Sequence, residues 1–500
     1  MIATSASPPM ARTITRDATV SATRLTALAL SLFYLVTCLY IARHRLFWYD
    51  ELFTVDIAWL PHAKNIWSAL RHAVDAQPPL YYLIVRTFGA AFGRNEIAAR
   101  LPSTLGVVGG LLLTFACARR VTNGLHALIA LALPTCSILL YYGYEARPYG
   151  LFFLLSALAL RIWTGPSTRW TPLLFGAVLF LGCMIHYYFL LTLVPYGLWE
   201  LLHWRPWQRP SARLVAGVAG TALALALNYP VIASFAREFP QSIWGTPSLP
   251  ALEDVFTRLF PLGFFLLPLM VIWVVLACAR RQPPATTVPP MPDAESLGWL
   301  FLCIPLAGFV LAEWKHEGFI PRYFIGALPG IAVAFSCWLW RSFRDFALVS
   351  LGIFLLLMGA GVIRQLAVVR HPDDPMEQST VTRQYLELEA RLHREGKRFL
   401  LFSRPLLYLE AEYYSPHRSE YVFLLPSGLE DDPHFQTQRG LQRLQAFYPL
   451  QIAAPPFDLR SHADETALIQ PTAQVLDEVK KAGLTAETRF AGPIEVLYLH

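Results

Sequence analysis

Uncharged stretches of close to twenty residues recur through the first 365 positions of this chain, and they limit its fold more than any other feature. The first of them is Leu25–Ala42. Only 15% of the 500 residues are charged and 55% are hydrophobic, whereas soluble domains carry about 25% charged residues. A helix of about twenty apolar residues crosses the hydrocarbon core of a bilayer. The sequence therefore predicts an α-helical polytopic membrane protein.

The apolar runs divide into eleven predicted spans, preceded by a cytoplasmic N-terminal tail at 1–24. A further apolar segment, 78–93, is split by Arg86 into pieces too short to cross. We interpret it as a juxtamembrane helix lying in the interface and opened by Pro78 and Pro79. The spans are expected at 25–42, 101–118, 125–143, 148–163, 171–185, 187–203, 214–236, 257–279, 296–312, 323–340 and 346–363.

Arginines beside the spans predict the orientation. With eleven spans, one side of the membrane collects Arg12, Arg16, Arg24, Arg119, Arg120, Arg161, Arg169, Arg205, Arg209, Arg213, Arg280, Arg281, Arg341 and Arg344, and Arg43 and Arg45 are exceptions on the other side. Short cytoplasmic loops carry an excess of positive charge, so this side is expected to be the cytoplasm. The N-terminus then lies inside and the C-terminus outside. The net charge of +6 reflects this topology, and no nucleic acid partner is implied.

Three outer segments of the predicted bundle combine acids, bases and aromatic residues. The first is the loop 43–100, which contains WYDE and DAQPPLYY. The others are YYGYEARPYG at 141–150 and EWKHEGFIPRYF at 313–324. Charged side chains at membrane depth are costly and usually functional. Carboxylates that act as a base and cations that hold an anion suit the transfer of a phosphate-linked group.

The C-terminal region, 366–500, differs in kind and predicts a small extracytoplasmic α/β domain. In VTRQYLELEARLHREG, apolar residues recur at helical spacing up to Gly396. KRFLLFS, SEYVFLL and EVLYLH are typical of strands, whereas PLLYLEAEYY, RGLQRLQAFY and AQVLDEVKKAG favour helices. We find no phosphate-binding loop, GxGxxG motif or metal cluster in this region.

The order of WYDE, QPPLYY, NEIAARLPS, YEARPYG and IPRYFIGALPG resembles that of the multispan glycosyltransferases that use polyprenyl-phosphate sugars. Within them it is most similar to the bacterial relatives of protein O-mannosyltransferases and of the lipid A aminoarabinose transferase. The resemblance covers residues 25–365 and implies a GT-C fold in a transmembrane glycosyltransferase domain. It also implies an inverting transfer from a lipid phosphate such as undecaprenyl phosphate to a glycolipid, polysaccharide or protein.

The resemblance assigns roles to residues of the outer segments. Asp50 is expected to be the general base, with Glu51 as a neighbour that raises its pKa or helps to hold a cation. Arg147 and Arg322 are expected to face the lipid phosphate. The remaining predicted substrate-binding residues are Gln77, Glu145 and Tyr323. No metal ligand is assigned, although more distant relatives use a divalent cation such as Mg²⁺ or Mn²⁺.

Other interpretations of these residues remain open. Glu145 and Arg147 could form a local ion pair at the end of a span, and Arg322 could be an interface anchor. His186 is interpreted as an interface histidine, and Tyr81 and Tyr82 as interface packing. For the whole chain, the alternative is a transporter or flippase of lipid-linked saccharides, which should show internal repeats and interrupted helices. The sugar, the acceptor and the oligomeric state are not predicted.

Overall fold

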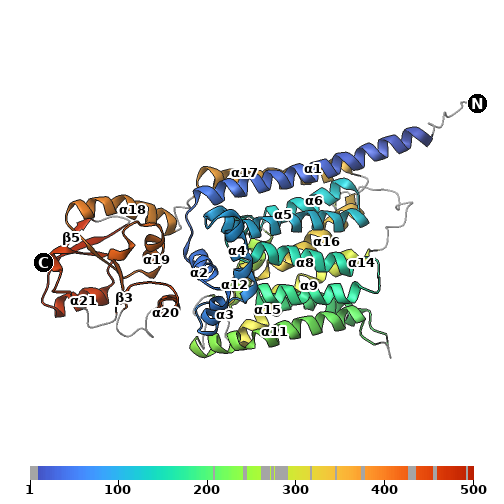
Figure 1. Ribbon diagram of the computed structural model, residues 1–500. Helices are drawn as coiled ribbons and strands as arrows, with labels where there is room; N and C mark the ends of the chain where they lie inside the picture. The colour runs from blue at the N-terminus through green and yellow to red at the C-terminus, as the bar shows by residue number, and fades with distance from the viewer. Residues whose placement is uncertain are drawn as a thin grey trace, which may run out of the picture. The chain divides into compact units, whose positions relative to one another are not determined.

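The computed structural model describes most of the chain and is largely helical (Figure 1). The described residues are 9–205, 209–239, 245–260, 271, 275, 291–315, 318–343, 346–372, 378–425, 435–453, 459–490 and 494–500. Most of the predicted span 257–279, together with His316 and Glu317 of the third outer segment, lies outside them. The chain forms two compact units. Unit 1 comprises Met1–Tyr40, Arg100–Leu227 and Trp244–Val369, and unit 2 comprises Ile41–Ala99, Asn228–Ile243 and Arg370–His500.

Unit 1 is a bundle of apolar helices, several of which lie side by side in Figure 1. Contacts join α8 to α9, α6 to α16, and α16 to α14. Its helices are α5 (Glu96–Val121), α6 (Gly124–Thr135), α7 (Leu139–Tyr142), α8 (Tyr149–Trp163), α9 (Thr171–Ile185), η1 (Tyr187–Thr192), α10 (Leu193–Leu202), α11 (Ala212–Glu238), α12 (Leu249–Leu259), α14 (Asp293–Leu300), α15 (Cys303–Lys315), η2 (Pro321–Ala327), α16 (Leu328–Phe343) and α17 (Ala347–Arg370). Helices α5, α11 and α17, and α1 (Pro9–His44), have parts assigned to unit 2.

Six segments of the described chain are long and apolar enough to cross a membrane. They are Ser21–His44, Glu96–Val121, Ala212–Glu238, Asp293–Lys315, Pro321–Phe343 and Ala347–Arg370. Three shorter apolar helices, α6, α8 and α9, match further predicted spans. The polytopic membrane fold predicted from the sequence is confirmed, whereas the count of eleven spans and the orientation stay predictions.

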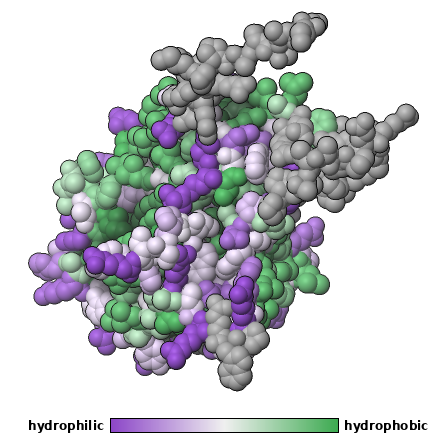
Figure 2. Space-filling view, turned by 90° about the vertical axis from the view of Figure 1, so that its right-hand side faces the viewer, coloured by the Kyte–Doolittle hydropathy of each residue, from purple (hydrophilic) through white to green (hydrophobic). Residues whose placement is uncertain are grey.

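Arginines gather at one end of the bundle, as the topology argument expected. Arg213 Nη1 donates to the carbonyl of Trp163, the last residue of α8, at 2.6 Å. A Cβ built on Gly165, two residues further on, would lie 3.4 Å from Nη1 of both Arg120 and Arg161. Figure 2 views the molecule from the right-hand side of Figure 1. Hydrophilic side chains gather over the middle of that face, with hydrophobic side chains toward its flanks.

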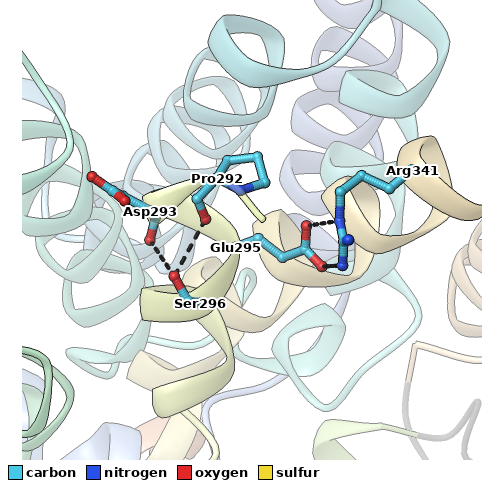
Figure 3. A network of polar contacts seen from close by, with 5 residues as sticks. All are labelled: Pro292, Asp293, Glu295, Ser296 and Arg341. Carbon is cyan, nitrogen blue, oxygen red and sulfur yellow. Dashed lines mark hydrogen bonds and ion pairs between the residues drawn. The ribbon is translucent and has the colours of Figure 1, made fainter. Parts of the chain in front are cut away.

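A buried ion pair joins α14 to α16 (Figure 3). Glu295 is fully buried, and its two carboxylate oxygens accept from Nε and Nη2 of Arg341, both at 2.6 Å. Ser296 is the next residue of α14, and its hydroxyl donates to the carbonyls of Pro292 and Asp293 at the start of the helix. The sequence indicated Arg341 only as a membrane-edge cation, so its carboxylate partner is new information from the structure.

In unit 2, the segment between the first two long helices folds into three short helices. They are α2 (Tyr49–Ala58), α3 (Ala63–Arg71) and α4 (Pro79–Phe92), and they contact one another. Arg86 on α4 donates to the carbonyls of Ala58 and Pro61, at 3.0 and 2.9 Å. The helix predicted at 78–93 is therefore confirmed, and Pro79 occupies its first turn as expected. Its position in a membrane interface stays a prediction.

The C-terminal part of unit 2 is a small α/β domain with a six-stranded mixed sheet of order β3-β2-β1-β4-β6-β5. The first four strands in that order are parallel, and β6 pairs antiparallel with both of its neighbours, β4 and β5. Its elements are α18 (Gln378–Arg394), β1 (Phe399–Phe402), α19 (Pro405–Tyr414), η3 (Arg418–Glu420), β2 (Tyr421–Leu424), α20 (Phe435–Leu444), β3 (Ile452–Ala453), η5 (Ala463–Glu465), β4 (Thr466–Ile469), α21 (Ala473–Lys481), β5 (Ala486–Phe490) and β6 (Val496–Leu499).

Helices cover both faces of this sheet. Leu401 and Leu468 pack with Val475 of α21 on one face. Phe402 points to the other face, because neighbouring strand residues alternate. There it contacts Tyr385 of α18 and Tyr408 of α19, with ring centroids 5.2 and 5.7 Å away. A parallel sheet covered on both faces explains why the central strands read as continuous apolar runs in the sequence.

Candidate active site

The predicted site residues fall into two sets, one in each unit. Arg147, Glu145, Arg322 and Tyr323 belong to unit 1, and Asp50, Glu51 and Gln77 belong to unit 2. All of these residues lie in the three outer segments that the sequence analysis indicated.

The turn that carries Arg147 is fixed against α5. Ser103 Oγ donates to the carbonyl of Tyr142 at 2.7 Å and accepts from the backbone N–H of Gly150 at 3.2 Å. A Cβ on Gly150 would clash with the carbonyl oxygen of Ser103. The two helix backbones can therefore meet only because this position is glycine. The close approach of the two backbones thus explains why the motif YEARPYG ends in glycine.

Arg147 and Arg322 converge on the same aromatic side chains. Arg322 lies on η2, and its Cζ is 5.9 Å from the ring centroid of Tyr149. Ser156 of α8 holds η2 in place through a 2.6 Å hydrogen bond to the carbonyl of Gly326. Arg147 is buried, and its charge also acts on Tyr149. The structure therefore brings together two arginines that are far apart in the sequence.

His186 belongs to this cluster, although the sequence indicated only an interface histidine. Its ring centroid lies 5.5 Å from that of Tyr149 and 5.1 Å from that of Tyr323. It sits between α9 and η1, and Nδ1 accepts from the backbone N–H of Tyr188 at 3.2 Å. Burial, together with the charges of Arg147 and Arg322, lowers the pKa of His186 to about 3. The imidazole is therefore neutral, and the hydrogen bond at Nδ1 leaves the proton on Nε2.

The hydroxyl of Tyr149 and Nε2 of His186 are buried polar atoms without a hydrogen-bond partner within the described part of the chain. A buried donor without an acceptor costs about 1–3 kcal/mol. We call Arg147, Tyr149, His186, Arg322 and Tyr323 the arginine cluster. It offers two guanidinium groups and two neutral donors, which is a set suited to phosphate oxygens.

Glu145 lies two residues before Arg147 in the same turn, and it is buried. Its assignment to substrate binding stays a prediction. Tyr323 stacks on Tyr149 at 6.5 Å and is tilted against Tyr188 at 4.7 Å. The structure therefore packs Tyr323 between other aromatic rings of the cluster, and its assignment to substrate binding stays a prediction.

In unit 2, the two adjacent acids occupy the first turn of α2 in different ways. Glu51 is fully buried, and its Oε2 accepts from the backbone N–H of Trp48, the residue before the helix, at 3.3 Å. This is one half of a capping box, so Glu51 helps to begin the helix. Asp50 is only partly buried. The positive end of the helix dipole favours negative charge at both positions.

Asp75 is a functional candidate that the sequence argument missed. Its Oδ2 accepts from the hydroxyl of Tyr82 at 2.7 Å and its Oδ1 from the N–H of Ala76 at 2.6 Å. Burial raises the pKa of Tyr49 well above its ordinary value, and the charges of Asp50 and Asp75 raise it further. Both carboxylates therefore act on the same phenol. Asp75 stands two residues before Gln77 in DAQPPLYY, which is the signal that could have found it.

Gln77 is buried, and its Oε1 has no hydrogen-bond partner among the residues that the structure describes. A buried amide oxygen of this kind is suited to accept from a ligand. Its assignment to substrate binding stays a prediction.

Comparisons with known proteins identify the fold. Residues 76–233 match a family model described as dolichyl-phosphate-mannose-protein mannosyltransferase. That segment contains QPPLYY, NEIAARLPS and YEARPYG, but neither Asp50 nor Arg322. No curated protein matches the sequence.

Two crystal structures of ArnT from Cupriavidus metallidurans are similar over almost the whole chain. The apo structure aligns with a TM-score of 0.60 and 11% identity, covering 96% of this chain and 98% of ArnT. The structure bound to undecaprenyl phosphate aligns with a TM-score of 0.59 and 12% identity, covering 94% and 97%. The resemblance stated from the sequence is confirmed, and the chain has the GT-C fold.

Proposed function

We propose that this protein is an inverting glycosyltransferase. It moves a sugar from a polyprenyl phosphate to a hydroxyl or phosphate group of a glycolipid, polysaccharide or protein acceptor. The match to a mannosyltransferase family and the fold shared with ArnT support the class of reaction. An ArnT structure bound to undecaprenyl phosphate supports a polyprenyl-phosphate donor.

The observation that carries this proposal is the convergence of Arg147 and Arg322 on Tyr149 and His186. When the sugar leaves its donor, negative charge develops on the departing lipid phosphate. Fixed donors aimed at that charge stabilise the transition state. The planar guanidinium group of arginine can hold two phosphate oxygens and stays charged when partly dehydrated. A transporter would need no such group to stabilise a leaving phosphate.

The transfer is a single displacement. An acceptor oxygen attacks the anomeric carbon, the bond from that carbon to the phosphate oxygen breaks, and the phosphate leaves with the electron pair. For a hydroxyl acceptor, the proton passes to Asp50. We assign this role to Asp50 rather than to Glu51 because Glu51 is fully buried and caps α2, whereas Asp50 is partly exposed.

We propose that Asp50 and Asp75, whose charges both act on Tyr49, would hold a divalent cation such as Mg²⁺ or Mn²⁺. The buried Oε1 of Gln77, two residues after Asp75, is a further candidate ligand. Carboxylate and amide oxygens are the ligands that these ions prefer. When bound, the ion would supply positive charge that stabilises anionic groups of the substrate.

We also propose that the arginine cluster faces the periplasm of a bacterial inner membrane. The cluster lies at the start of α8, whereas Arg120, Arg161 and Arg213 lie around its last residue. The 15 residues of α8 span about 21 Å at 1.5 Å per residue. If the second group faces the cytoplasm, the cluster faces the other side. The N-terminus is then cytoplasmic and the C-terminus periplasmic.

Binding of bare undecaprenyl phosphate tests the phosphate site separately from chemistry. Wild-type protein in detergent should bind the lipid, whereas Arg147→Ala and Arg322→Ala should each weaken binding by about tenfold or more, since a charged hydrogen bond contributes about 1.5–3 kcal/mol. Arg169→Ala is the matched control, because Arg169 is an exposed arginine stacked on Trp170. Equal affinity in wild type and both cluster variants would refute the phosphate site.

Asp50→Asn separates binding from transfer. The variant should bind undecaprenyl phosphate as the wild type does, but transfer sugar about 10²–10⁴-fold more slowly, because the side chain can no longer accept a proton. The assay follows a radiolabelled sugar from a panel of polyprenyl-phosphate donors. Near-normal turnover by Asp50→Asn would refute the base assignment and leave Asp50 as an interfacial acid.

A further inference from the structure

Three metal-ligating side chains meet in the C-terminal domain, and none of them has a role in the proposed reaction. They are His393 at the end of α18, His417 in the turn after α19, and Glu420 at the end of η3. One ligand atom from each lies within 4.8 Å of the others. The sequence argument found no metal cluster here, and the three side chains come together only in the folded chain. His393 is separated from the other two by a strand and a helix, so no local spacing reveals the group.

The geometry inside this group differs from that of a simple hydrogen-bonded pair. His393 Nε2 and Glu420 Oε2 are 2.9 Å apart, yet the angles at these atoms do not meet hydrogen-bond geometry. The rings of His393 and His417 are edge-on at 4.2 Å with an interplanar angle of 76°. Ligands about 2.0–2.2 Å from a tetrahedral zinc ion lie about 3.3–3.6 Å from each other. The separation of His393 Nε2 and Glu420 Oε2, 2.9 Å, is shorter than this, so the two side chains would move slightly apart to admit the ion.

A buried carboxylate holds the ligand-bearing segments together. Glu389, one helical turn before His393, accepts through Oε1 from Ser415 Oγ at 2.7 Å and also from the hydroxyl of Tyr421. Ser415 Oγ in turn accepts from the backbone N–H of His417 at 2.9 Å. Residues four apart lie on one face of a helix. The hydrogen bonds of Glu389 therefore hold the turn that carries His417 beside the part of α18 that carries His393.

Only one carboxylate oxygen of Glu420 is near the cation Arg398, and the other faces His393, where a metal could bind. Arg398 Nη1 lies 3.7 Å from Oε1 of Glu420, and its side chain is 56% exposed. The other oxygen, Oε2, faces His393. Two neutral imidazoles and one carboxylate form the ligand set of several zinc sites that keep a fourth position for water. Imidazole nitrogen favours zinc over Mg²⁺ or Mn²⁺, which prefer oxygen ligands.

We propose that His393, His417 and Glu420 bind one Zn²⁺ ion, with water as the fourth ligand. The ion joins the end of α18 to the connection between α19 and β2, and so stabilises the C-terminal domain. This site is separate from the oxygen ligands near Asp50.

The test uses the full-length protein, purified in detergent through a tag without histidine, because a polyhistidine tag binds zinc itself. The protein is dialysed against a chelator and then titrated with ZnCl₂ alone, with bound zinc measured by elemental analysis and isothermal calorimetry. Co²⁺ in place of Zn²⁺ should give the intense visible bands of a four-coordinate site. One tight equivalent of zinc per chain is expected for the wild type.

Three variants decide whether the group binds zinc. His417→Ala should lower the affinity for zinc more than 100-fold, beyond the about 10–100-fold typical of losing an outer partner of a ligand. The exposed position of His417 makes this variant compatible with folding, which gel filtration checks. Glu420→Gln should behave in the same way. His500→Ala is the matched control, since His500 pairs with Glu487 at 3.5 Å and belongs to no three-residue group within the described chain.

The outcomes separate zinc binding from an ion pair. Loss of the tight equivalent and of the cobalt bands in His417→Ala and Glu420→Gln, with both kept in His500→Ala, supports the site. No tight equivalent in the wild type, or the same equivalent in all variants, overturns it and leaves His393 and Glu420 as a salt bridge.

Discussion

A proton held at Glu412 makes one part of unit 2 sensitive to pH near neutrality. Glu412 lies on α19, and its Oε2 is buried with no hydrogen-bond partner in the described chain. Burial raises the pKa of Glu412 from 4.5 to about 7, and Arg418 offsets part of this shift. Asp56 of α2 is also buried, and burial together with the charge of Glu412 raises its pKa well above the ordinary value. Two buried carboxyl groups thus belong to helices that contact each other.

The magnitude follows from the difference between the folded and unfolded states. Each unit of pKa difference corresponds to 1.36 kcal/mol. A carboxyl whose pKa rises from 4.5 to about 7 on folding therefore adds about 3 kcal/mol to the free energy of unfolding at low pH. The folded state keeps the proton to a higher pH than the unfolded state. Its free energy of unfolding therefore falls as pH rises from about 4.5 to about 7, and the loss is complete above that range.

Glu412→Gln tests this account, because glutamine keeps the shape of the protonated acid and cannot ionise. We expect the variant to equal the wild type near pH 4 and to gain up to about 3 kcal/mol relative to it at pH 8. The measurement is amide hydrogen exchange of peptides from α2 and α19 in full-length protein, with rates divided by the intrinsic rate at each pH. Opening free energies follow from these protection factors.

Two further variants sharpen the result. Glu387→Gln changes an exposed acid of α18 and should leave the pH dependence of α19 unchanged. Asp56→Asn combined with Glu412→Gln should remove more of the pH dependence than Glu412→Gln alone, because burial also raises the pKa of Asp56. If Glu412→Gln kept the full decrease between pH 5 and pH 7, the raised pKa of Glu412 would not be its cause, and the argument from burial would fail.

Three other predictions concern unit 1 and the cation. Arg341→Ala should destabilise the protein by about 3–5 kcal/mol, since it leaves Glu295 buried and unpaired. Thermal unfolding in detergent measures this, with Arg258→Ala as an exposed ion-pair control expected to cost less than about 1 kcal/mol. His186→Ala should weaken binding of undecaprenyl phosphate equally at pH 5.5 and pH 8, because a pKa of about 3 keeps this imidazole neutral; an effect at one pH alone would refute the neutral donor. Dialysis against EDTA should slow sugar transfer, and Mg²⁺ or Mn²⁺ should restore it; transfer at the full rate without metal would remove the cation from the proposal.

Helices and strands with strong local signals could be predicted from the sequence. Pro79 begins α4, and Gly396, with a φ of +78°, follows the end of α18 as expected. Strand β1 is nearly as predicted because a central parallel strand is apolar throughout. Strands β3, β4 and β5 were missed. In β5, Ala486–Phe490, four of the five residues are exposed at the edge of the sheet. Without a buried face, such a strand has no alternating pattern to reveal it.

The candidate site could be predicted only as separate segments. Charged residues at the ends of spans indicated Arg147 and Arg322, because charge at membrane depth is unusual. His186 gave no such signal, since a single histidine beside tyrosines is common at interfaces. Its role depends on Tyr149 and Tyr323, whose rings lie beside it only after folding. Asp75 was overlooked for a similar reason, because its hydroxyl partner Tyr82 was interpreted as packing.

The small residues of the site segments determine where the charged residues lie. A Cβ on Gly106 of α5 would lie 2.5 Å from the carbonyl carbon of Gly150 of α8, so both glycines are needed for the helices to meet. That contact allows Ser103 to hold the N–H of Gly150 and, through it, the turn that carries Arg147. A larger residue at position 150 would separate the helices and move Arg147 without removing its charge. A displacement of about 1 Å can cost about 10²-fold in rate. Such a variant would therefore lose sugar transfer because of changed packing, although Arg147 would still be present and charged.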